Sequence, residues 1–195
     1  RDPLSHKLKR ILDVMIAFFG LIFTLPIVFS ALLLSVFESG FPMFFSQNRT
    51  GFLGQTYILF KIRTMRLNAE EKNAKWAEVN DSRVTKTGSF LRKWRIDEIP
   101  QFWNVIKGEM SIVGPRPERP EFQERLIKKV PHWNCRHLVK PGLTGWAQVK
   151  FRYASDMESS EEKLAYDLYY IKHASILMDI QIILSTLRSL AKGSR

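Results

Sequence analysis

The sequence predicts an α+β fold that is attached to a membrane through an N-terminal helix. Residues 14–37 carry no charged side chain, and a helix of that length can cross about 30 Å of hydrocarbon. Two short strand patterns follow, and the remainder alternates between turns and amphipathic helical patterns. We therefore expect a kinked or re-entrant membrane helix, a small β-hairpin or sheet, and several amphipathic helices at the membrane interface.

The composition limits the class of partner. The chain has 195 residues and a formal net charge of +11, which suits one compact domain with an anionic partner. Nucleic acid, an anionic membrane surface and phosphorylated small molecules all fit this charge. Cys135 is the single cysteine, so no intrachain disulfide can form and a reducing cytoplasmic setting is the simpler assumption. The first residue, Arg1, is not methionine, which is consistent with a fragment of a longer protein.

The apolar segment is interrupted by Pro26 near its middle. A proline inside a helix removes a backbone hydrogen bond and costs about 3 kcal/mol, and Thr24 and Ser30 are near enough to bond the carbonyls that it frees. Cations flank both ends of the segment, so the positive-inside rule selects no orientation unless both ends are cytoplasmic. A re-entrant hairpin satisfies both observations, and a kinked spanning helix is the alternative. We expect residues 1–40 to be the anchor and residues 41–195 the cytoplasmic interfacial domain.

The next elements are two short strands, residues 44–47 and 55–61, around a glycine-bearing turn. In the second strand Lys61 and Arg63 alternate with apolar residues, so both cations can point to one face. That face is either simply solvated or binds phosphate. Residues 68–78 are predicted to form a polar connecting helix.

An acidic pair, Asp97 and Glu98, follows directly after three cations, which are Arg92, Lys93 and Arg95. We expect Asp97 to cap a short helix that has Pro100 in its first turn and stops at Gly108. The carboxylates would then sit at the positive end of a helix dipole, where backbone N–H groups also favour a bound phosphate. The simpler interpretation is that the two acids only cap and stabilise the helix.

Arg116 lies between two prolines, Pro115 and Pro117. The prolines restrict the backbone, so the guanidinium is held by a stiff turn. Such a group is suited to bidentate phosphate recognition. Together with the acidic pair, it predicts a site for a phosphorylated substrate and a metal ion.

The C-terminal part is expected to contain an amphipathic helix at 121–130, then a turn and strand at 142–151. A capping-box pattern at Ser159 and Glu162 predicts a helix that ends near His173. The last helix carries an apolar stripe, which we assign to the core or to an interface; it comprises Ile176, Ile180, Ile183, Leu187 and Leu190.

Several motifs closely resemble the bacterial sugar transferases, the monotopic polyprenyl-phosphate phosphoglycosyl transferases. They include Asp97-Glu98-Ile99-Pro100-Gln101, Gly114-Pro115-Arg116-Pro117 and Lys140-Pro141-Gly142-Leu143-Thr144-Gly145-Trp146, with further likeness at 47–51, 61–65 and 81–92. The motifs follow the order of the family and cover nearly the whole chain. They resemble the catalytic domain of the longer undecaprenyl-phosphate hexose-phosphate transferases, and this favours the re-entrant hairpin.

The resemblance implies transfer of a sugar-1-phosphate from a UDP-sugar to undecaprenyl phosphate, the first membrane step of exopolysaccharide or O-antigen assembly. It implies Asp97 as the nucleophile of a covalent phosphosugar intermediate and Glu98 as a ligand of Mg²⁺. It places Arg92 and Arg116 at the transferring or acceptor phosphate, and three further cations near the donor, namely Lys61, Arg63 and Arg83. The expected location is the cytoplasmic face of the bacterial inner membrane, with lipid as a partner, no nucleic acid, and a possible homodimer.

Two other functions fit the same residues. A Mg²⁺-dependent hydrolase of lipid diphosphates would share the site and release free phosphosugar. A basic, membrane-anchored binding module without catalysis would use Asp97 and Glu98 only for stability. A nucleic-acid-binding module would explain the charge but not the apolar segment.

Overall fold

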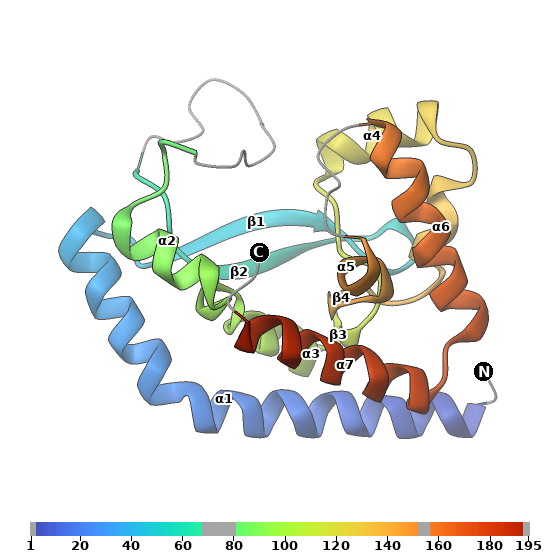
Figure 1. Cartoon of the computed structure of the whole chain (residues 1–195), viewed down its shortest axis with the longest axis horizontal. Coiled ribbons are helices and arrows are strands. Elements are labelled where there is room, and N and C mark those ends of the chain that lie inside the picture. Colours follow the sequence, from blue (N-terminus) through green and yellow to red (C-terminus); the bar gives the residue numbers. More distant parts are fainter. Residues whose placement is uncertain (1–2, 68–80, 152–156, 193–195) are drawn as a thin grey trace.

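The computed structural model describes residues 3–67, 81–151 and 157–192 (Figure 1). Its helices and strands are α1 (Pro3–Ser39), β1 (Phe44–Thr50), β2 (Thr56–Ile62), α2 (Lys86–Lys93), α3 (Gln101–Lys107), β3 (Ser111–Val113), α4 (Pro120–Lys129), β4 (Gly142–Thr144), α5 (Trp146–Lys150), α6 (Met157–His173) and α7 (Ile176–Ala191). Short 3₁₀ turns occur at η1 (Phe52–Gly54), η2 (Ile96–Glu98) and η3 (Trp133–Leu138). The α+β class is confirmed, because helices surround two separate two-stranded sheets.

The helix α1 is long and apolar enough, by length and composition, to cross a membrane. Figure 1 shows it as a long arm along the bottom of the molecule, followed by a bend and a second arm. Pro26 lies inside the helix. Thr24 donates to the Gly20 carbonyl (2.6 Å) and Ser30 to the Pro26 carbonyl (2.9 Å). These bonds to the preceding turn favour bending at the proline. Among the described residues, neither hydroxyl bonds the carbonyl of Ile22, which Pro26 deprives of its usual donor.

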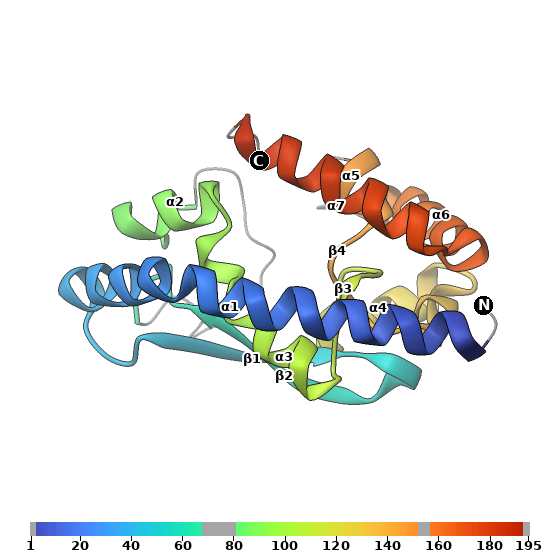
Figure 2. The ribbon, with the colours of Figure 1, turned by 90° about the horizontal axis from the view of Figure 1, so that it is seen from below.

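The first arm of α1 is hydrogen-bonded to the rest of the molecule before its apolar segment begins. Arg10 donates to the Val105 and Ile106 carbonyls in the last turn of α3, at 2.7 and 3.0 Å. Asp13 is buried and accepts from the Ser111 hydroxyl of β3 at 2.8 Å. Lys9 pairs with Asp179 of α7 at 3.0 Å. Seen from below, α1 crosses the molecule with the β-hairpin on one side and α7 on the other (Figure 2).

The predicted hairpin is present, with longer strands than expected. β1 and β2 pair antiparallel from Phe44 opposite Ile62 to Thr50 opposite Thr56. The polar residues after Gln47, which were assigned to the turn, continue the ladder because Thr50 is buried and its N–H donates to the Glu118 carbonyl at 2.9 Å. The actual turn spans 51–55.

One prediction for the C-terminal part is wrong. The strand expected within 142–151 ends at Thr144 and is followed by helix α5, in which Trp146 stacks on Tyr169 of α6 with ring centroids 6.1 Å apart. The apolar stripe of α7, assigned to the core or to an interface, is divided: Ile183 packs against the core cluster, whereas Ile180 is 48% and Leu187 56% exposed. The buried face instead contains Met178, Asp179 and Ile182, because the carboxylate of Asp179 bonds both Lys9 and the Tyr170 hydroxyl.

Other boundaries follow the sequence more closely. The helix predicted at 121–130 is α4, displaced by one residue. The helix predicted from Ser159 begins at Met157 and ends at His173 as expected. The polar helix predicted at 68–78 lies outside the described residues.

Candidate functional site

The acidic pair lies in the 3₁₀ turn η2, between α2 and α3. The prediction that Asp97 caps α3 is wrong, because α3 starts only after Pro100. Arg95 adopts a left-handed backbone conformation (φ 53°, ψ 25°), which reverses the chain after α2 and places both acids inside a separate turn. The predicted stop is confirmed, since Gly108 ends α3 with φ 91°.

The turn packs directly on the second arm of α1. Ala31 of that arm forms a buried cluster with Ile62 and Leu91, and the neighbouring Val28, Leu32 and Ile96 pack against it. Glu38, near the end of α1, accepts the N–H groups of Lys86 and Thr87 at 2.8 Å each, which caps the first turn of α2. The apolar helix therefore sets the position of α2 and of the acidic pair.

Glu98 is held by three cations from three different segments. Its Oε1 accepts from Lys61 Nζ at 2.8 Å and from Arg116 Nη2 at 2.7 Å, and its Oε2 lies 3.3 Å from Arg95 Nη1. Burial raises the pKa of Glu98, but the attraction of Arg116, Lys61 and Arg95 outweighs it and holds the pKa well below its usual range. The Lys61 and Arg116 that the sequence selected thus converge on one carboxylate.

Asp97 has the opposite environment. It is 6% exposed, and among the described residues its carboxylate accepts no hydrogen bond and forms no ion pair. Burial and the adjacent charge of Glu98 raise the pKa of Asp97, against a lowering by Lys61, Arg92 and Arg116. Two neighbouring carboxylates with opposite pKa shifts are typical of sites in which the two groups have different roles.

The other three predicted cations, Arg92, Arg63 and Arg83, have bonding partners other than Glu98. Arg92, at the end of α2, donates from Nε to the Thr64 hydroxyl at 2.8 Å and is close enough to influence Asp97. Arg63 lies beside the second arm of α1, because its carbonyl accepts from the Ser35 hydroxyl at 2.8 Å. Arg83 is bonded by Asp81, with Nε to Oδ1 at 2.8 Å, and this pairing lowers the pKa of Asp81 to about 2. Arg83 is thus not part of the group of cations around Glu98.

Sequence reasoning missed the groups that hold the loop of Arg116. Arg136 is 2% exposed; it donates to the Arg116 carbonyl at 2.8 Å and to Asp167 at 2.7 Å. Arg49 donates to the Pro117 carbonyl at 3.1 Å. Only the position of Arg49 in the 47–51 motif was a usable signal, because the Arg136–Asp167 pair joins residues that are distant in the sequence.

Two glycines explain how this loop approaches the segment at 140–145. β3 pairs parallel with β4, Ser111 with Gly142 and Val113 with Thr144. A Cβ on Gly142 would lie 2.1 Å from the Gly114 nitrogen, and one on Gly114 would lie 2.4 Å from the Lys140 carbonyl oxygen. Only glycine permits this contact, so both motifs are needed to place Arg116.

The fit of a metal ion differs between the two acids. The described part of the chain contains no cluster of three or more His, Cys, Asp or Glu side chains. Both oxygens of Glu98 already face cations, so this carboxylate does not fit the role of a direct Mg²⁺ ligand. Asp97 has oxygens without such partners and fits that role, with phosphate oxygens completing the ligand set.

The chain matches the family described as bacterial sugar transferase over residues 4–193. It is 39% identical over 192 residues to UDP-N-acetylgalactosamine-undecaprenyl-phosphate N-acetylgalactosaminephosphotransferase of Aeromonas hydrophila, covering 98% of this chain and 45% of the relative. It is 39% identical over 189 residues to UDP-glucose:undecaprenyl-phosphate glucose-1-phosphate transferase of Escherichia coli K12, covering 94% and 41%. The chain thus spans less than half of each of these relatives. It spans 86% of the uncharacterized sugar transferase EpsL of Bacillus subtilis, at 39% identity.

Proposed function

Because this chain belongs to the bacterial sugar transferase family, we propose that it moves a sugar-1-phosphate from a UDP-sugar to undecaprenyl phosphate. The observation that carries the proposal is the asymmetry of the acidic pair. Glu98 is neutralised by Lys61, Arg116 and Arg95, whereas Asp97 beside it has no bonded partner among the described residues. An available carboxylate surrounded by cations is suited to attack a phosphorus atom whose other oxygens are negatively charged.

In the first step an Asp97 oxygen attacks the phosphorus that carries the sugar. The bond from that phosphorus to the bridging oxygen of the diphosphate breaks, UMP leaves with both electrons, and an aspartyl phosphosugar remains. Arg116 and Lys61 are positioned to neutralise the phosphate oxygens, since Glu98 holds both beside Asp97. Such preorganised positive charge acts without reorganisation during the reaction.

In the second step an oxygen of the undecaprenyl phosphate attacks the same phosphorus. The bond to Asp97 breaks, the carboxylate is regenerated, and the product is the lipid diphosphate sugar. No net proton transfer is required, because one phosphate anion replaces another. Arg92 and Arg63 lie on the side of the second arm of α1, where a lipid phosphate would arrive.

Mg²⁺ is the cofactor that fits this chemistry. Asp97 and phosphate oxygens of the donor would hold it, and the ion would supply further neutralisation of the diphosphate. Glu98 then acts by fixing Arg116 and Lys61.

The location that we propose is the cytoplasmic face of the bacterial inner membrane, with α1 as a re-entrant anchor. Both of its arms bond the same domain: Lys9, Arg10 and Asp13 at one end, Ser35 and Glu38 at the other. These bonds support the proposal that both ends lie on one side of the bilayer, which the flanking cations also favour.

Mass spectrometry and radiolabelling test the covalent step. Incubation with a labelled UDP-sugar and no lipid should leave label on the wild-type protein and on the Glu161→Gln control, but none on Asp97→Asn. Adding undecaprenyl phosphate should transfer the label to lipid. Turnover by Asp97→Asn would refute the covalent route, and release of free phosphosugar in place of a lipid product would identify a hydrolase.

A further inference from the structure

Two cations meet beside the first arm of α1 and have no role in the steps above. Arg10 Nη2 and Lys140 Nζ both approach Gly108, at 3.5 and 3.6 Å from the point where a Cβ on that residue would lie. Gly108 has a positive φ (91°) at the end of α3, and no side chain of its own separates the two cations. A third cation, Lys7, is exposed one turn before Arg10 on the same face of α1. We call Lys7, Arg10 and Lys140 the entry cluster.

Lys140 has no anionic partner in the described part of the chain. It is half-buried, and its ammonium group forms no hydrogen bond or ion pair with any described residue. Burial and the positive charge of Arg10 lower the pKa of Lys140, against a raising effect of Asp13. Asp13 is already bonded by β3 at 2.8 and 3.1 Å and lies 3.5 Å from Lys9. An anion between Lys140 and Arg10 would relieve a repulsion that Asp13 only partly offsets.

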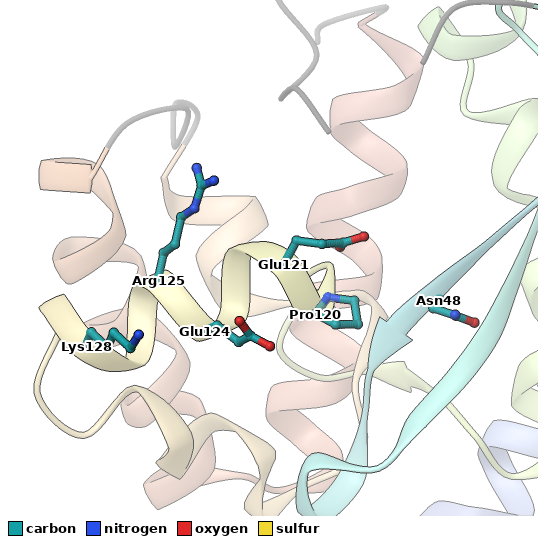
Figure 3. Close-up of a pocket in the computed structure, with 6 residues that line it drawn as sticks. All are labelled: Asn48, Pro120, Glu121, Glu124, Arg125 and Lys128. Carbon is teal, nitrogen blue, oxygen red and sulfur yellow. The ribbon is translucent and has the colours of Figure 1, made fainter. Parts of the chain in front are cut away.

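The cations on α4 have a different setting. Arg125 and Lys128 line a pocket of about 510 Å³ that also contains the carboxylates of Glu121 and Glu124 (Figure 3). Two acids therefore match the two cations of this lining. Figure 1 shows α4 at the top of the molecule and α1 along the bottom. The excess of positive charge at the entry cluster is thus specific to the side of α1.

The entry cluster borders an apolar face of α1 that begins before the uncharged segment. Exposed apolar side chains recur every three or four residues along the first arm, at Leu4, Leu8, Ile11, Met15 and Phe18. Lys7 and Arg10 lie between members of this series, so their charged ends can sit at the border of the apolar face. Where such a face enters a bilayer, its basic border meets the phosphate groups of the lipids.

The entry cluster is separate from the acidic pair. Arg10 bonds carbonyls in the last turn of α3, whereas Asp97 and Glu98 lie in the turn that precedes α3. The length of α3 separates the two places by about 10 Å, at a rise of about 1.5 Å per residue. A phosphate at the entry cluster is therefore too far from Asp97 to be the group that reacts.

We propose that the entry cluster binds the phosphate of an anionic membrane phospholipid such as phosphatidylglycerol. Lys140 and Arg10 would hold the phosphate between them, and the acyl chains would lie along the apolar face of the first arm. The inference goes beyond the proposed function, because it rests on insertion of α1 into lipid and not on sugar transfer. The bound lipid would hold the first arm at the level of the head groups. It would also fix Lys140, whose carbonyl oxygen lies against Gly114 at the start of the loop of Arg116.

Native mass spectrometry of the purified full chain in detergent tests this site, because it counts the lipids that stay bound to each protein molecule. Wild-type protein should retain phosphatidylglycerol at lower lipid concentrations than phosphatidylcholine with the same acyl chains, which has no net charge. Lys140→Gln should weaken the retention of phosphatidylglycerol about fivefold, and Lys140→Arg should restore it because the charge returns. The matched control is Lys128→Gln, which removes the same charge from α4 and should retain the lipid like the wild type.

Arg10 also bonds α3, so Arg10→Gln alone could act by loosening that helix. The ammonium group of Lys140 bonds no described residue, and this keeps Lys140→Gln decisive. Retention of phosphatidylglycerol by Lys140→Gln within twofold of the wild type would overturn the inference. So would an equal loss in Lys128→Gln, because net charge alone would then explain the effect.

Two competitors distinguish the source of the phosphate. Inorganic phosphate and undecaprenyl phosphate, each added at the concentration of phosphatidylglycerol, should leave that lipid bound. Displacement by either would overturn the inference, because a free phosphate or the acceptor lipid would then be the occupant. Release of UMP from UDP-sugars is a separate measurement: its absence would refute the proposed function and leave the lipid assignment intact.

Discussion

Asp97 and Glu98 are adjacent in the sequence but differ in every contact that matters for chemistry. The difference arises from the cationic side chains that bond each carboxylate. Lys61 from β2 and Arg116 from the loop after β3 both bond Glu98. Asp97 is desolvated without a comparable partner among the described residues. We therefore expect Glu98 to stay ionised at neutral pH, and we propose that activity depends on the ionisation of Asp97.

The acid limb of the pH profile, where the rate of UMP release falls at low pH, should reflect protonation of Asp97. Its ionised form is the proposed nucleophile, and its pKa is raised, so the rate of UMP release should fall as the pH drops through that raised value. Lys61→Gln removes a positive charge that lowers the pKa of Asp97, so the limb should move to higher pH. Single-turnover release of UMP between pH 5 and 9 measures the shift. A limb that stays in place or moves to lower pH would exclude Asp97 as the titrating group.

Metal dependence separates the roles of the two acids. EDTA should abolish adduct formation and Mg²⁺ should restore it. Because the oxygens of Glu98 face cations, Glu98→Gln should lower the rate on the order of 10²-fold while the Mg²⁺ concentration for half-maximal activity changes less than twofold. Measuring the residual activity of Glu98→Gln at increasing Mg²⁺ concentrations tests this expectation. A tenfold higher requirement would return Glu98 to the role of metal ligand that the family resemblance implies.

At the scale of elements, the site depends on the close contact between β3 and β4. The Gly114-Pro115-Arg116-Pro117 segment is placed by a parallel pair only three residues long on each side, and by Arg136, which bonds the Arg116 carbonyl. The sequence identified Arg116 and its stiff flanks. It did not identify Arg136 or Asp167, because their pairing is set by how α6 packs against η3.

Gly142→Ala should disrupt this contact. Its new Cβ would lie 2.1 Å from the Gly114 nitrogen, so the two strands must separate, with a loss of roughly 3 kcal/mol or more in the free energy of unfolding. Thermal unfolding in detergent measures the loss. Gly40→Ala is the control: Gly40, unlike Gly142, has a positive φ (71°) and has open space around it, so only backbone strain of about 1–2 kcal/mol is expected. Equal effects of the two substitutions would rule out the steric contact as the cause.

At the scale of the whole molecule, we propose that α1 determines how the domain meets the membrane. Its first arm bonds α3, β3 and α7, and its second arm packs on the catalytic turn. Between these attachments it exposes a wide apolar surface that includes Phe19, Phe23 and Phe29. In the re-entrant arrangement that we propose, burying that surface in lipid while both ends remain with the domain would place the acidic pair near the head groups.

Cysteine labelling tests this arrangement. In a Cys135→Ser background, Lys7→Cys and Phe41→Cys flank the apolar segment, and both positions are exposed. A membrane-impermeant maleimide should label both in inside-out vesicles and neither in right-side-out vesicles. Labelling of the two positions from opposite sides would show that α1 spans the bilayer.

The sequence by itself determined the apolar helix and its proline, the hairpin, helices α4 and α6, and the choice of Asp97, Glu98, Lys61 and Arg116 as candidate site residues. These are local signals, because hydropathy, periodicity, turn residues and short motifs lie in contiguous segments. Only the tertiary structure decided that Asp97 sits in a turn instead of a helix cap, that residues 146–150 form a helix, and which face of α7 is buried. Each of those outcomes depends on bonds or packing between distant segments, such as the Lys9–Asp179 pair and the stacking of Trp146 on Tyr169. The same reason applies to the partners of Glu98: Lys61 and Arg116 are 37 residues before it and 18 after it, and only the fold brings them to one carboxylate.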